Sequence, residues 1–321
     1  MTSDSILNIN HPDIFFHLKD FAGDHLVYLK LEGLNAAGSI KLKTAVSMIA
    51  GLEQRGRIQP GKHRIIESSS GNLGIALSIV CKVKGYAFTC IMDPNASPVS
   101  VKLIKLYGGH VIQIAEKDEH GGYLNTRIRK IHEILDHDKD CVWTNQYANP
   151  DNPSAHERTT APEIFKAFPK LNFLFVGTST TGTLGGCARF FKEHSPETRI
   201  IAVEPEGSVT FGHAPGRRLI PGLGTSRRPE IASLDNVHEV LLVREEDTIA
   251  MCWHILERYG LFAGASTGTV LQAVRAYAAR LPPKSLVVAI SPDFGDKYLD
   301  TVYNQEWVRK HYGNNVSPND Y

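Results

Sequence analysis

The sequence predicts an α/β protein whose parallel sheet is covered by helices on both faces. Apolar runs of strand length alternate with longer amphipathic segments from about residue 62 onward. The short runs are almost continuously apolar, as in strands that are buried on both faces. The chain has 321 residues, enough for two domains or one large α/β unit. These three observations together indicate a sheet between two layers of helices.

The expected elements follow one another in chain order. Strands are expected at residues 63–67, 87–92, 110–114, 173–176, 200–203, 239–243 and 286–290. Helices are expected at residues 44–52, 74–84, 99–107, 122–135, 163–168, 184–194, 246–259 and 269–280. Ligands of such sheets bind beyond the carboxyl ends of the strands, where three loops rich in small residues are expected, at 68–74, 177–186 and 264–269. The segment 145–153, rich in Asn and Pro, is the expected crossover between two lobes.

Composition and charge exclude several classes of partner. The chain is 42% hydrophobic and 21% charged, and its net charge of +1 creates no field for nucleic acid or a membrane surface. Its five cysteines are scattered, and four lie in apolar runs, so we expect buried thiols without disulfides or metal. No signal-peptide pattern or membrane-length apolar run is present. We expect a cytoplasmic protein.

The segment E-S-S-S-G-N-L-G, from Glu67 to Gly74, is the most informative stretch of the chain. It lies between a predicted strand and a predicted helix. Backbone N–H groups and hydroxyls converge at such a helix N-terminus, where the helix dipole also favours negative charge. An ordinary helix cap needs one Ser or Asn, whereas four such residues stand here around Gly71. The segment therefore favours an anion-binding loop over a simple cap.

A second loop of small residues, G-T-S-T-T-G-T, runs from Gly177 to Thr183 after a predicted strand. Its N–H groups and hydroxyls suit a phosphate group at the start of the next helix. The loop lacks the lysine of a nucleotide P-loop and the spacing of a dinucleotide fingerprint. A phosphate-bearing cofactor without a nucleoside fits better, and a plain Gly/Thr-rich turn is the alternative.

A lysine precedes the first predicted helix. Lys41 follows the Gly38-Ser39 turn, and a lysine near desolvating residues at a helix N-terminus can have a pKa low enough for a Schiff base. Lys43 is the nearby competitor, and a surface position is the alternative for either lysine.

In six motifs the sequence resembles the fold-type II pyridoxal phosphate enzymes of the cysteine synthase and cystathionine β-synthase family. The resemblance covers nearly the whole chain, and the motifs occur in the family's order. They are K-L-E-x-x-N-x-x-x-S-x-K at 30–41, S-S-G-N at 69–72, N-Q-Y-A-N at 145–149, S-T-T-G-T at 179–183, G-L-G at 222–224 and G-A-S-T-G at 264–268.

The resemblance implies a role for each motif. Lys41 corresponds to the Schiff-base lysine of pyridoxal 5'-phosphate, Asn72 to the residue at the ring hydroxyl and Ser266 to the residue at the pyridine nitrogen. The cofactor phosphate corresponds to Ser179, Thr180, Thr181, Gly182 and Thr183. The implied substrate-binding residues are Ser69, Ser70, Gly71, Gln146, Tyr147 and Gly222.

The family resemblance also implies the architecture, a tryptophan synthase β-like fold of two three-layer α/β/α lobes with largely parallel sheets. Residues 1–45 and 146–321 would form the larger lobe, which carries the phosphate and ring-nitrogen sites. Residues 46–145 would form a smaller mobile lobe with the carboxylate loop. A homodimer is implied by the resemblance alone.

A narrower resemblance points to one branch of the family, the N-(2-amino-2-carboxyethyl)-L-glutamate synthases. The segments that carry it lie at 120–127, 207–212, 219–227 and 292–300. The branch supplies 2,3-diaminopropionate for siderophores of the staphyloferrin B type, which implies O-phospho-L-serine and L-glutamate as substrates. Arg127 is a candidate for the phosphate leaving group, because a guanidinium binds phosphate bidentately. A helix-surface arginine beside Arg129 and Lys130 is the alternative.

Other features favour a different second substrate. The family's N-terminal G-x-T-P segment is missing, and the residues around Lys41 differ from the run in the siderophore enzymes. The segment 155–163 is more similar to ordinary cysteine synthases. A cysteine synthase that uses O-acetylserine or O-phosphoserine with sulfide is therefore the alternative. A non-catalytic relative is a further alternative, against which intact Lys41, Asn72 and Ser266 argue.

Overall fold

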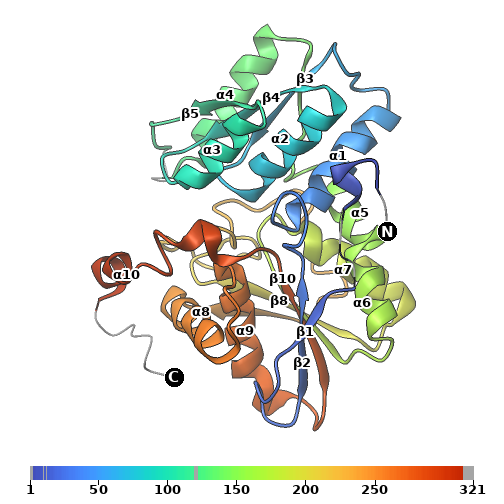
Figure 1. The fold of residues 1–321 in the computed structure, drawn as a ribbon, viewed down its shortest axis with the longest axis vertical. Coiled ribbons are helices and arrows are strands. Elements are labelled where there is room, and N and C mark those ends of the chain that lie inside the picture. The colour runs from blue at the N-terminus through green and yellow to red at the C-terminus, as the bar shows by residue number, and fades with distance from the viewer. Residues whose placement is uncertain (1–2, 10, 12, 119–121, 314–321) are drawn as a thin grey trace.

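The computed structural model describes residues 3–9, 11, 13–118 and 122–313, and two sheets organise them (Figure 1). The larger sheet has the strand order β1-β2-β10-β7-β8-β9, and the smaller has the order β5-β4-β3-β6. All paired neighbours are parallel except β1 and β2. The predicted α/β class with largely parallel sheets is confirmed. The strands are β1 Phe15–His17, β2 Leu26–Leu31, β3 Arg64–Ser68, β4 Ala87–Met92, β5 His110–Gln113, β6 Cys141–Trp143, β7 Phe173–Gly177, β8 Arg199–Pro205, β9 Glu239–Val243 and β10 Leu286–Ser291.

Helices surround both sheets. They are α1 Lys41–Gln54, α2 Asn72–Lys84, α3 Pro98–Leu106, α4 Leu124–His137, α5 Asp151–Arg158, α6 Thr160–Ala167, α7 Gly182–His194, α8 Glu245–Tyr259, α9 Ala265–Tyr277 and α10 Gln305–Tyr312. The three loops expected from the sequence are all shorter than predicted, because α2 begins inside 68–74, α7 inside 177–186 and α9 inside 264–269. None of the helices described is long and apolar enough to cross a membrane.

Five elements were not predicted from the sequence: β1, β2, β6, α5 and α10. Lys30 interrupts the apolar run of β2, and β6 has only three residues. The helix α5 lies largely in the expected crossover segment. Its buried face carries Asn152 and His156 beside Ala155, so it shows no apolar helical period. The end of the expected crossover segment, residues 151–153, is therefore helical.

The larger sheet lies between two helical layers. On one face, Phe173, Phe175 and Val287 pack in a core with residues of α8 and α9. On the other face, Leu174 and Val288 pack with residues of α6 and α7. Strand side chains alternate between the two cores, which gives the three-layer arrangement.

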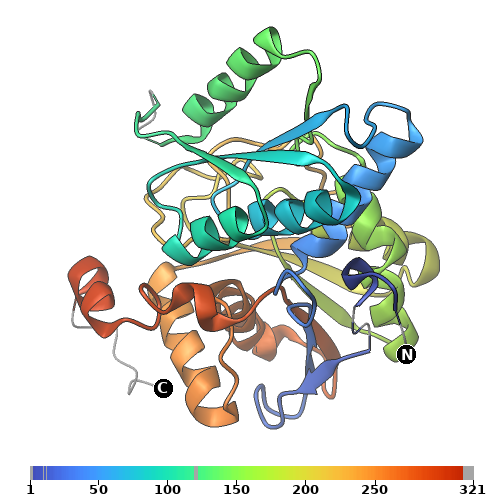
Figure 2. The same ribbon diagram turned by 45° about the horizontal axis from the view of Figure 1, so that its top comes forward.

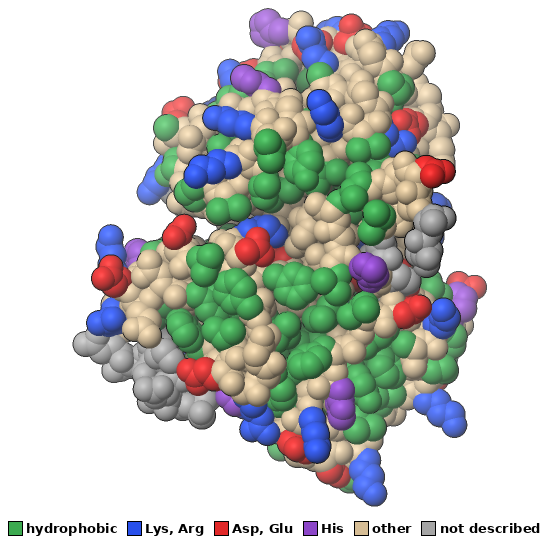
Figure 3. Space-filling model, viewed as in Figure 1, with side chains coloured by type: hydrophobic (Ala, Val, Ile, Leu, Met, Phe, Trp, Pro, Cys, Tyr) green, Lys and Arg blue, Asp and Glu red, His purple; other side chains and the backbone are tan. Residues whose placement is uncertain are grey.

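The smaller sheet repeats this arrangement. Ile65 and Phe88 contribute to a core that α1 and α2 cover, whereas Ile66 and Ile91 pack against Ile131 of α4. The turned view shows the smaller sheet stacked above the larger (Figure 2). The space-filling view shows a notch between the two lobes on one side (Figure 3). All five cysteines are buried and free, as expected.

Candidate active site

Lys41 is the first residue of α1 and is held by the turn before it. The Asn35 side-chain amide donates to the carbonyls of Glu32 and Ser39, each at 2.9 Å. The N–H of Ile40 donates to the Pro292 carbonyl at 2.8 Å. This turn contains the Asn and Ser of the K-L-E-x-x-N-x-x-x-S-x-K motif. It places Lys41 against the segment that follows β10.

The Lys41 side chain lines a cavity that also contains other predicted site residues. Burial lowers the pKa of Lys41 from 10.5 to about 8, while the negative charge of Asp293 opposes the shift. Near pH 8, a substantial fraction of a lysine with this pKa is neutral, and the neutral amine can act as a nucleophile or base. The predicted site residues that line this cavity are Lys41, Asn72, Ser179, Thr180, Thr181, Gly182, Thr183, Gly222 and Ser266.

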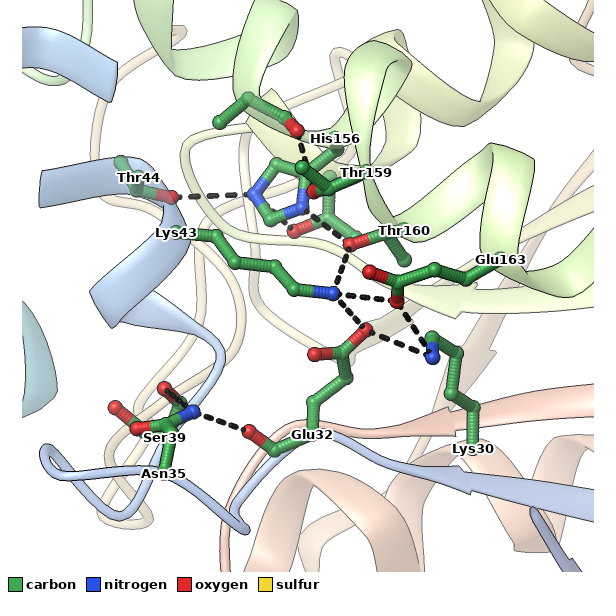
Figure 4. Close-up of polar contacts among 12 residues, drawn as sticks. Lys30, Glu32, Asn35, Ser39, Lys43, Thr44, His156, Thr159, Thr160 and Glu163 are labelled. Carbon is green, nitrogen blue, oxygen red and sulfur yellow. Dashed lines mark hydrogen bonds and ion pairs between the residues drawn. The ribbon is translucent and has the colours of Figure 1, made fainter. Parts of the chain in front are cut away.

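Lys43, the competing lysine, has a different environment (Figure 4). Its ammonium lies 2.9 Å from Glu32 Oε1 and 2.7 Å from Glu163 Oε2. Lys30 contacts the same two carboxylates, at 3.5 and 2.7 Å. The four charges form a mostly buried cluster of alternating sign. Lys43 is therefore held in structural ion pairs, and Lys41 is the better nucleophile.

His156 joins the lysine helix to the phosphate loop (Figure 4). Its Nε2 lies 3.1 Å from Thr44 Oγ1 and 3.3 Å from Thr183 Oγ1, and its Nδ1 lies 3.1 Å from Thr160 Oγ1. Burial lowers the pKa of His156 well below 6.5, and Lys41 and Lys43 add to the shift. A neutral imidazole thus connects α1 with α7. Nothing in the local sequence pattern had indicated this connection.

The S-T-T-G-T loop forms the junction between β7 and α7. Thr181 is the N-cap residue of α7 and has a φ of 64°, a left-handed conformation that is rare for a β-branched residue. Such strain is concentrated at functional sites. A side chain on Gly182 would collide with the Asn152 amide. The loop is therefore built around its backbone at the helix N-terminus, as an anion site requires.

The cavity residues fit a phosphorylated cofactor. Among the residues described, the buried Thr181 Oγ1 and Asn72 Oδ1 have no hydrogen-bond partner. Buried polar atoms of this kind are costly unless a ligand or water pairs with them. A Cβ on Gly222 would lie 2.9 Å from Ser266 Oγ, so only glycine leaves room there. These features match the phosphate, ring-hydroxyl and pyridine positions implied for pyridoxal phosphate.

A buried carboxylate missed by the sequence analysis joins two of these positions. Asp293 Oδ2 accepts from Asn72 Nδ2 at 2.8 Å and from the Tyr298 hydroxyl at 3.2 Å. Burial raises the pKa of Asp293, and Lys297 opposes the shift. Burial also raises the pKa of Tyr298, whose hydrogen bond to Ser266 acts in the opposite direction. The P-D-F-G-D-K-Y segment had been noticed only as a branch motif, because the sequence does not reveal that it lies beside Asn72.

The 69–72 loop follows β3, and its two serines have different contacts. Ser69 Oγ accepts from the N–H groups of Gly71 and Gly74, at 3.4 and 3.1 Å, so this hydroxyl caps α2. Ser70 Oγ donates to Asp93 Oδ2 at 2.6 Å and accepts from Arg127 Nη1 at 2.6 Å. The ordinary-cap alternative thus describes Ser69, while Ser70 belongs to a charged cluster.

Glu67 ties this loop to the predicted carboxylate-binding glutamine. Its Oε1 accepts from the Ser68 N–H at 2.7 Å and from Trp143 Nε1 at 2.9 Å. Its Oε2 accepts from Thr144 Oγ1 at 2.6 Å and from the Gln146 N–H at 3.1 Å. Burial raises the pKa of Glu67, and these four donors oppose the shift. The motif by itself indicates no role for Glu67, whereas in the structure Glu67 places Gln146 beside the loop.

Arg127 of α4 is not a surface arginine, since its side chain is 13% exposed. Its Nη1 lies 3.1 Å from Asp93 Oδ2, in addition to its contact with Ser70. Its Nε is buried and has no partner among the residues described. The segment at 120–127 that carried this prediction begins outside the described residues, which resume at Gly122.

The predicted residues fall into two groups. The wall of the Lys41 cavity contains the lysine and the cofactor-binding residues, but not Ser69, Ser70, Gly71, Gln146, Tyr147 or Arg127. The second group is joined to the cavity through Asn72, which follows Gly71 directly, and through Asn152. The Asn152 side-chain amide donates to the Gln146 carbonyl at 2.8 Å and to Thr180 Oγ1, in the cavity wall, at 3.3 Å. A separate depression beside Trp143 is lined partly by Arg57, His63 and Lys139 and contains no predicted site residue.

The cavity brings a lysine of lowered pKa together with a loop at a helix N-terminus, an arrangement that suits an aldehyde cofactor carrying a phosphate. Residues 15–293 match the family model described as pyridoxal-phosphate dependent enzyme, so the chain belongs to that family and pyridoxal phosphate is its cofactor. The match confirms the cofactor and family predictions.

Relatives place the chain among the synthases of this family. It is 43% identical over 285 residues to N-(2-amino-2-carboxyethyl)-L-glutamate synthase of Ralstonia nicotianae, with 88% of the chain and 84% of the relative covered. Among solved structures, it resembles an O-acetylserine dependent cystathionine β-synthase from Helicobacter pylori, at 29% identity, a TM-score of 0.87 and coverage of 95% and 100%. O-ureido-L-serine synthase gives 29% identity, a TM-score of 0.85 and coverage of 94% and 95%. The chain is an enzyme of the β-replacement type.

Proposed function

We propose that the enzyme converts O-phospho-L-serine and L-glutamate into N-(2-amino-2-carboxyethyl)-L-glutamate and phosphate. The product is the one named for the Ralstonia nicotianae relative, which is 43% identical to the chain. The structural observation that carries the proposal is the buried Arg127, hydrogen bonded to Ser70 of the predicted carboxylate loop. An arginine there suits a phosphate leaving group, which brings more negative charge than acetate.

Lys41 holds the cofactor and then serves as the base. When bound, pyridoxal phosphate supplies an electron sink for negative charge at the substrate Cα. The Lys41 Nζ removes the Cα proton, the Cβ–O bond breaks, and phosphate leaves with the bonding electrons. The amine of L-glutamate then forms a bond to Cβ and releases a proton, while Lys41 returns a proton to Cα. No oxidant or reductant is consumed.

The remaining residues bind and orient. The loop 69–72 and Gln146 hold the substrate carboxylate so that the Cα–H bond aligns for removal. Ser266, a neutral hydroxyl in the cavity wall, would bind the pyridine nitrogen and leave it unprotonated, which would favour elimination over longer-lived carbanion chemistry. Asp293 holds the Asn72 side chain through the 2.8 Å hydrogen bond, and Asn72 would bind the ring hydroxyl.

A single assay distinguishes this function from the two alternatives, a cysteine synthase and a non-catalytic module. A cysteine synthase is the second candidate, since the Helicobacter pylori neighbour is described as O-acetylserine dependent. Purified holoenzyme is given O-phospho-L-serine or O-acetyl-L-serine, each with L-glutamate or sulfide, and the products are identified by mass. We expect the glutamate adduct, formed fastest from O-phospho-L-serine. Cysteine as the only efficient product would overturn the proposal, and no product from any pair would favour a non-catalytic module.

Several finer expectations belong to the same proposal. The proposed lobe boundaries after residues 45 and 145 fit the two sheets, which take their strands from 15–31 with 173–291 and from 64–143. We propose that the smaller lobe is mobile. We also propose a homodimer, a cytoplasmic location and a role in 2,3-diaminopropionate supply for a siderophore or peptide product. Size measurement in solution and localisation of the native protein test the first two.

A further inference from the structure

The loop between β8 and β9 brings an arginine to the segment that carries Gln146. The guanidinium of Arg227 lies over the ring of Tyr147, 4.7 Å from its centroid. The N–H of Ile231 donates to the Tyr147 carbonyl at 3.1 Å and holds the loop on this segment. Tyr147 follows Gln146 directly, so Arg227 stands beside the predicted substrate site.

Arg218 reaches the same region from the other end of the loop. Its Nη1 donates to the Leu223 carbonyl at 3.3 Å, and its Nη2 donates to Ser226 Oγ at 3.0 Å. Leu223 lines the Lys41 cavity, so this guanidinium lies behind the cavity wall. Burial raises the pKa of Tyr147, and the charges of Arg127, Arg227 and Arg218 all oppose that shift. The three guanidiniums thus share one neighbourhood.

Each of these arginines has an unused donor. Within the described chain, the Nε atoms of Arg127, Arg218 and Arg227 are buried and have no hydrogen-bond partner. A buried charged donor without an acceptor is costly, and a ligand oxygen would remove that cost.

Arg218 has no carboxylate partner at close range. Arg127 pairs with Asp93 and Arg227 pairs with Glu230 at 2.9 Å, while no carboxylate of the described residues lies within 4.0 Å of Arg218. Glu245 and Glu204 act on Arg218 from further away. The Glu245 oxygens accept from the N–H groups of Leu219 and Ile220, and Glu204 Oε1 accepts from the Thr178 and Ser208 hydroxyls. The Arg218 guanidinium can therefore still pair with an anionic ligand.

We propose that Arg218 and Arg227 bind the two carboxylates of an amino dicarboxylate nucleophile beside the wall of the Lys41 cavity, with Arg127 left for the departing phosphate. The inference rests on the proposed function and names the side chains that select the second substrate. Guanidinium forks bind carboxylates bidentately, and two forks match two carboxylates while the amine stays free to reach Cβ. Sulfide has no carboxylate and would gain nothing from these residues.

The neighbouring arginines provide matched controls, because Arg217 and Arg228 are exposed. Initial rates of the holoenzyme are measured against L-glutamate at saturating O-phospho-L-serine for Arg218→Gln, Arg227→Gln, Arg217→Gln and Arg228→Gln. We expect the KM for L-glutamate to rise about tenfold or more in the first two variants, as for a lost charge-assisted contact. In the controls it should change by less than about twofold. Arg218→Lys keeps the charge without the fork and should give an intermediate KM.

A binding measurement supplies a second readout. The probe is 2-hydroxyglutarate, which has both carboxylates and a hydroxyl in place of the amine, so it cannot react. Calorimetry with the holoenzyme should show binding to the wild type and both controls, and at least about tenfold weaker binding to Arg218→Gln and Arg227→Gln. Thermal unfolding shows whether each variant folds, and the Lys variants take the place of any Gln variant that does not.

The outcomes separate this inference from the proposed function. A wild-type enzyme that forms no glutamate adduct overturns the proposed function and the inference with it. A wild type that forms the adduct, with unchanged KM and hydroxyglutarate affinity in both variants, overturns the inference alone. Loss in the two variants and not in the controls supports it.

Discussion

The two loops that follow β7 and β3 share a local plan but differ in their partners. Each joins a parallel strand to a helix N-terminus at the cleft. The β7 loop is braced mainly by uncharged groups of the larger lobe: Ser179 donates to the Gly224 carbonyl at 3.3 Å, and Asn152 donates to Thr180 at 3.3 Å. The β3 loop is braced by charges, those of Glu67, Asp93, Arg127 and Asp293.

The difference fits the role that we propose for each loop, the β7 loop for the cofactor phosphate and the β3 loop for the substrate carboxylate. A phosphate that stays bound is served by a fixed, neutral cradle whose N–H groups need no rearrangement. A substrate that enters and leaves in every turnover is served by a loop whose position depends on partners from other elements. The Asn72–Asp293 hydrogen bond joins the smaller sheet's loop to the chain after β10 of the larger sheet. Loop 69–72 therefore contacts elements of both sheets.

The largest effect is expected where the two loops meet, at Lys41. Lys41→Ala should lower turnover by about 10³-fold or more, because it removes the attachment point and the base. Borohydride reduction and peptide mapping of the wild type should place the pyridoxyl group on Lys41. Lys43→Met should keep that label but lose about 3 kcal/mol of unfolding free energy, since it leaves buried carboxylates without a partner. A label on Lys43 would contradict the assignment.

Breaking the charged bracing of the β3 loop should give the next largest effect. Glu67→Gln replaces one accepting oxygen by a donor, so two hydrogen bonds are lost and the unfolding free energy falls by about 2 kcal/mol. The KM for O-phospho-L-serine should rise about tenfold, whereas the Kd for pyridoxal phosphate should barely change. Steady-state kinetics and cofactor titration measure the two. An equal loss of cofactor affinity would show that the loops are not independent.

The Asp293 contact can be tested by pH. Lys41 is protonated and unreactive below its pKa, so the rate of cofactor attachment to the apoenzyme should rise as pH passes through about 8. Asp293 raises the pKa of Lys41, so Asp293→Asn should move this midpoint to lower pH. Asp296→Asn, at an exposed position three residues further on, is the control. Stopped-flow absorbance follows attachment, and a midpoint that moves upward in Asp293→Asn would refute the argument.

The smallest effect is expected from strain in the β7 loop. Thr181→Gly relieves a left-handed φ of 64°, so the apoenzyme should gain roughly 0.5 kcal/mol after the greater entropy of unfolded glycine is offset. The lost hydroxyl should weaken cofactor binding about fivefold. Thr180→Gly, where φ is not positive, should lose stability instead. Thermal unfolding of the two apoenzymes measures the difference, and a loss in both would argue against stored strain.

Much of the fold could be predicted because it depends on local pattern. The strands β4 and β9 match the expected bounds, and α7 and α8 begin within two residues of theirs. The strand β2 could not be predicted in this way. Lys30 is 1% exposed and is tolerated in the sheet only because Glu32 and Glu163 neutralise it. One of those partners is more than 100 residues away in the sequence.

The sequence by itself determined the fold class and the family and predicted the residues around the cofactor, since these depend on short motifs and on the periodicity of apolar residues. Only the tertiary structure decided how the residues are connected. It separated Lys41 from Lys43, turned Ser69 into a cap, buried Arg127 and placed Asp293 beside Asn72. The physical reason is that burial and charge pairing depend on side chains that meet across the cleft, from segments that no local pattern connects.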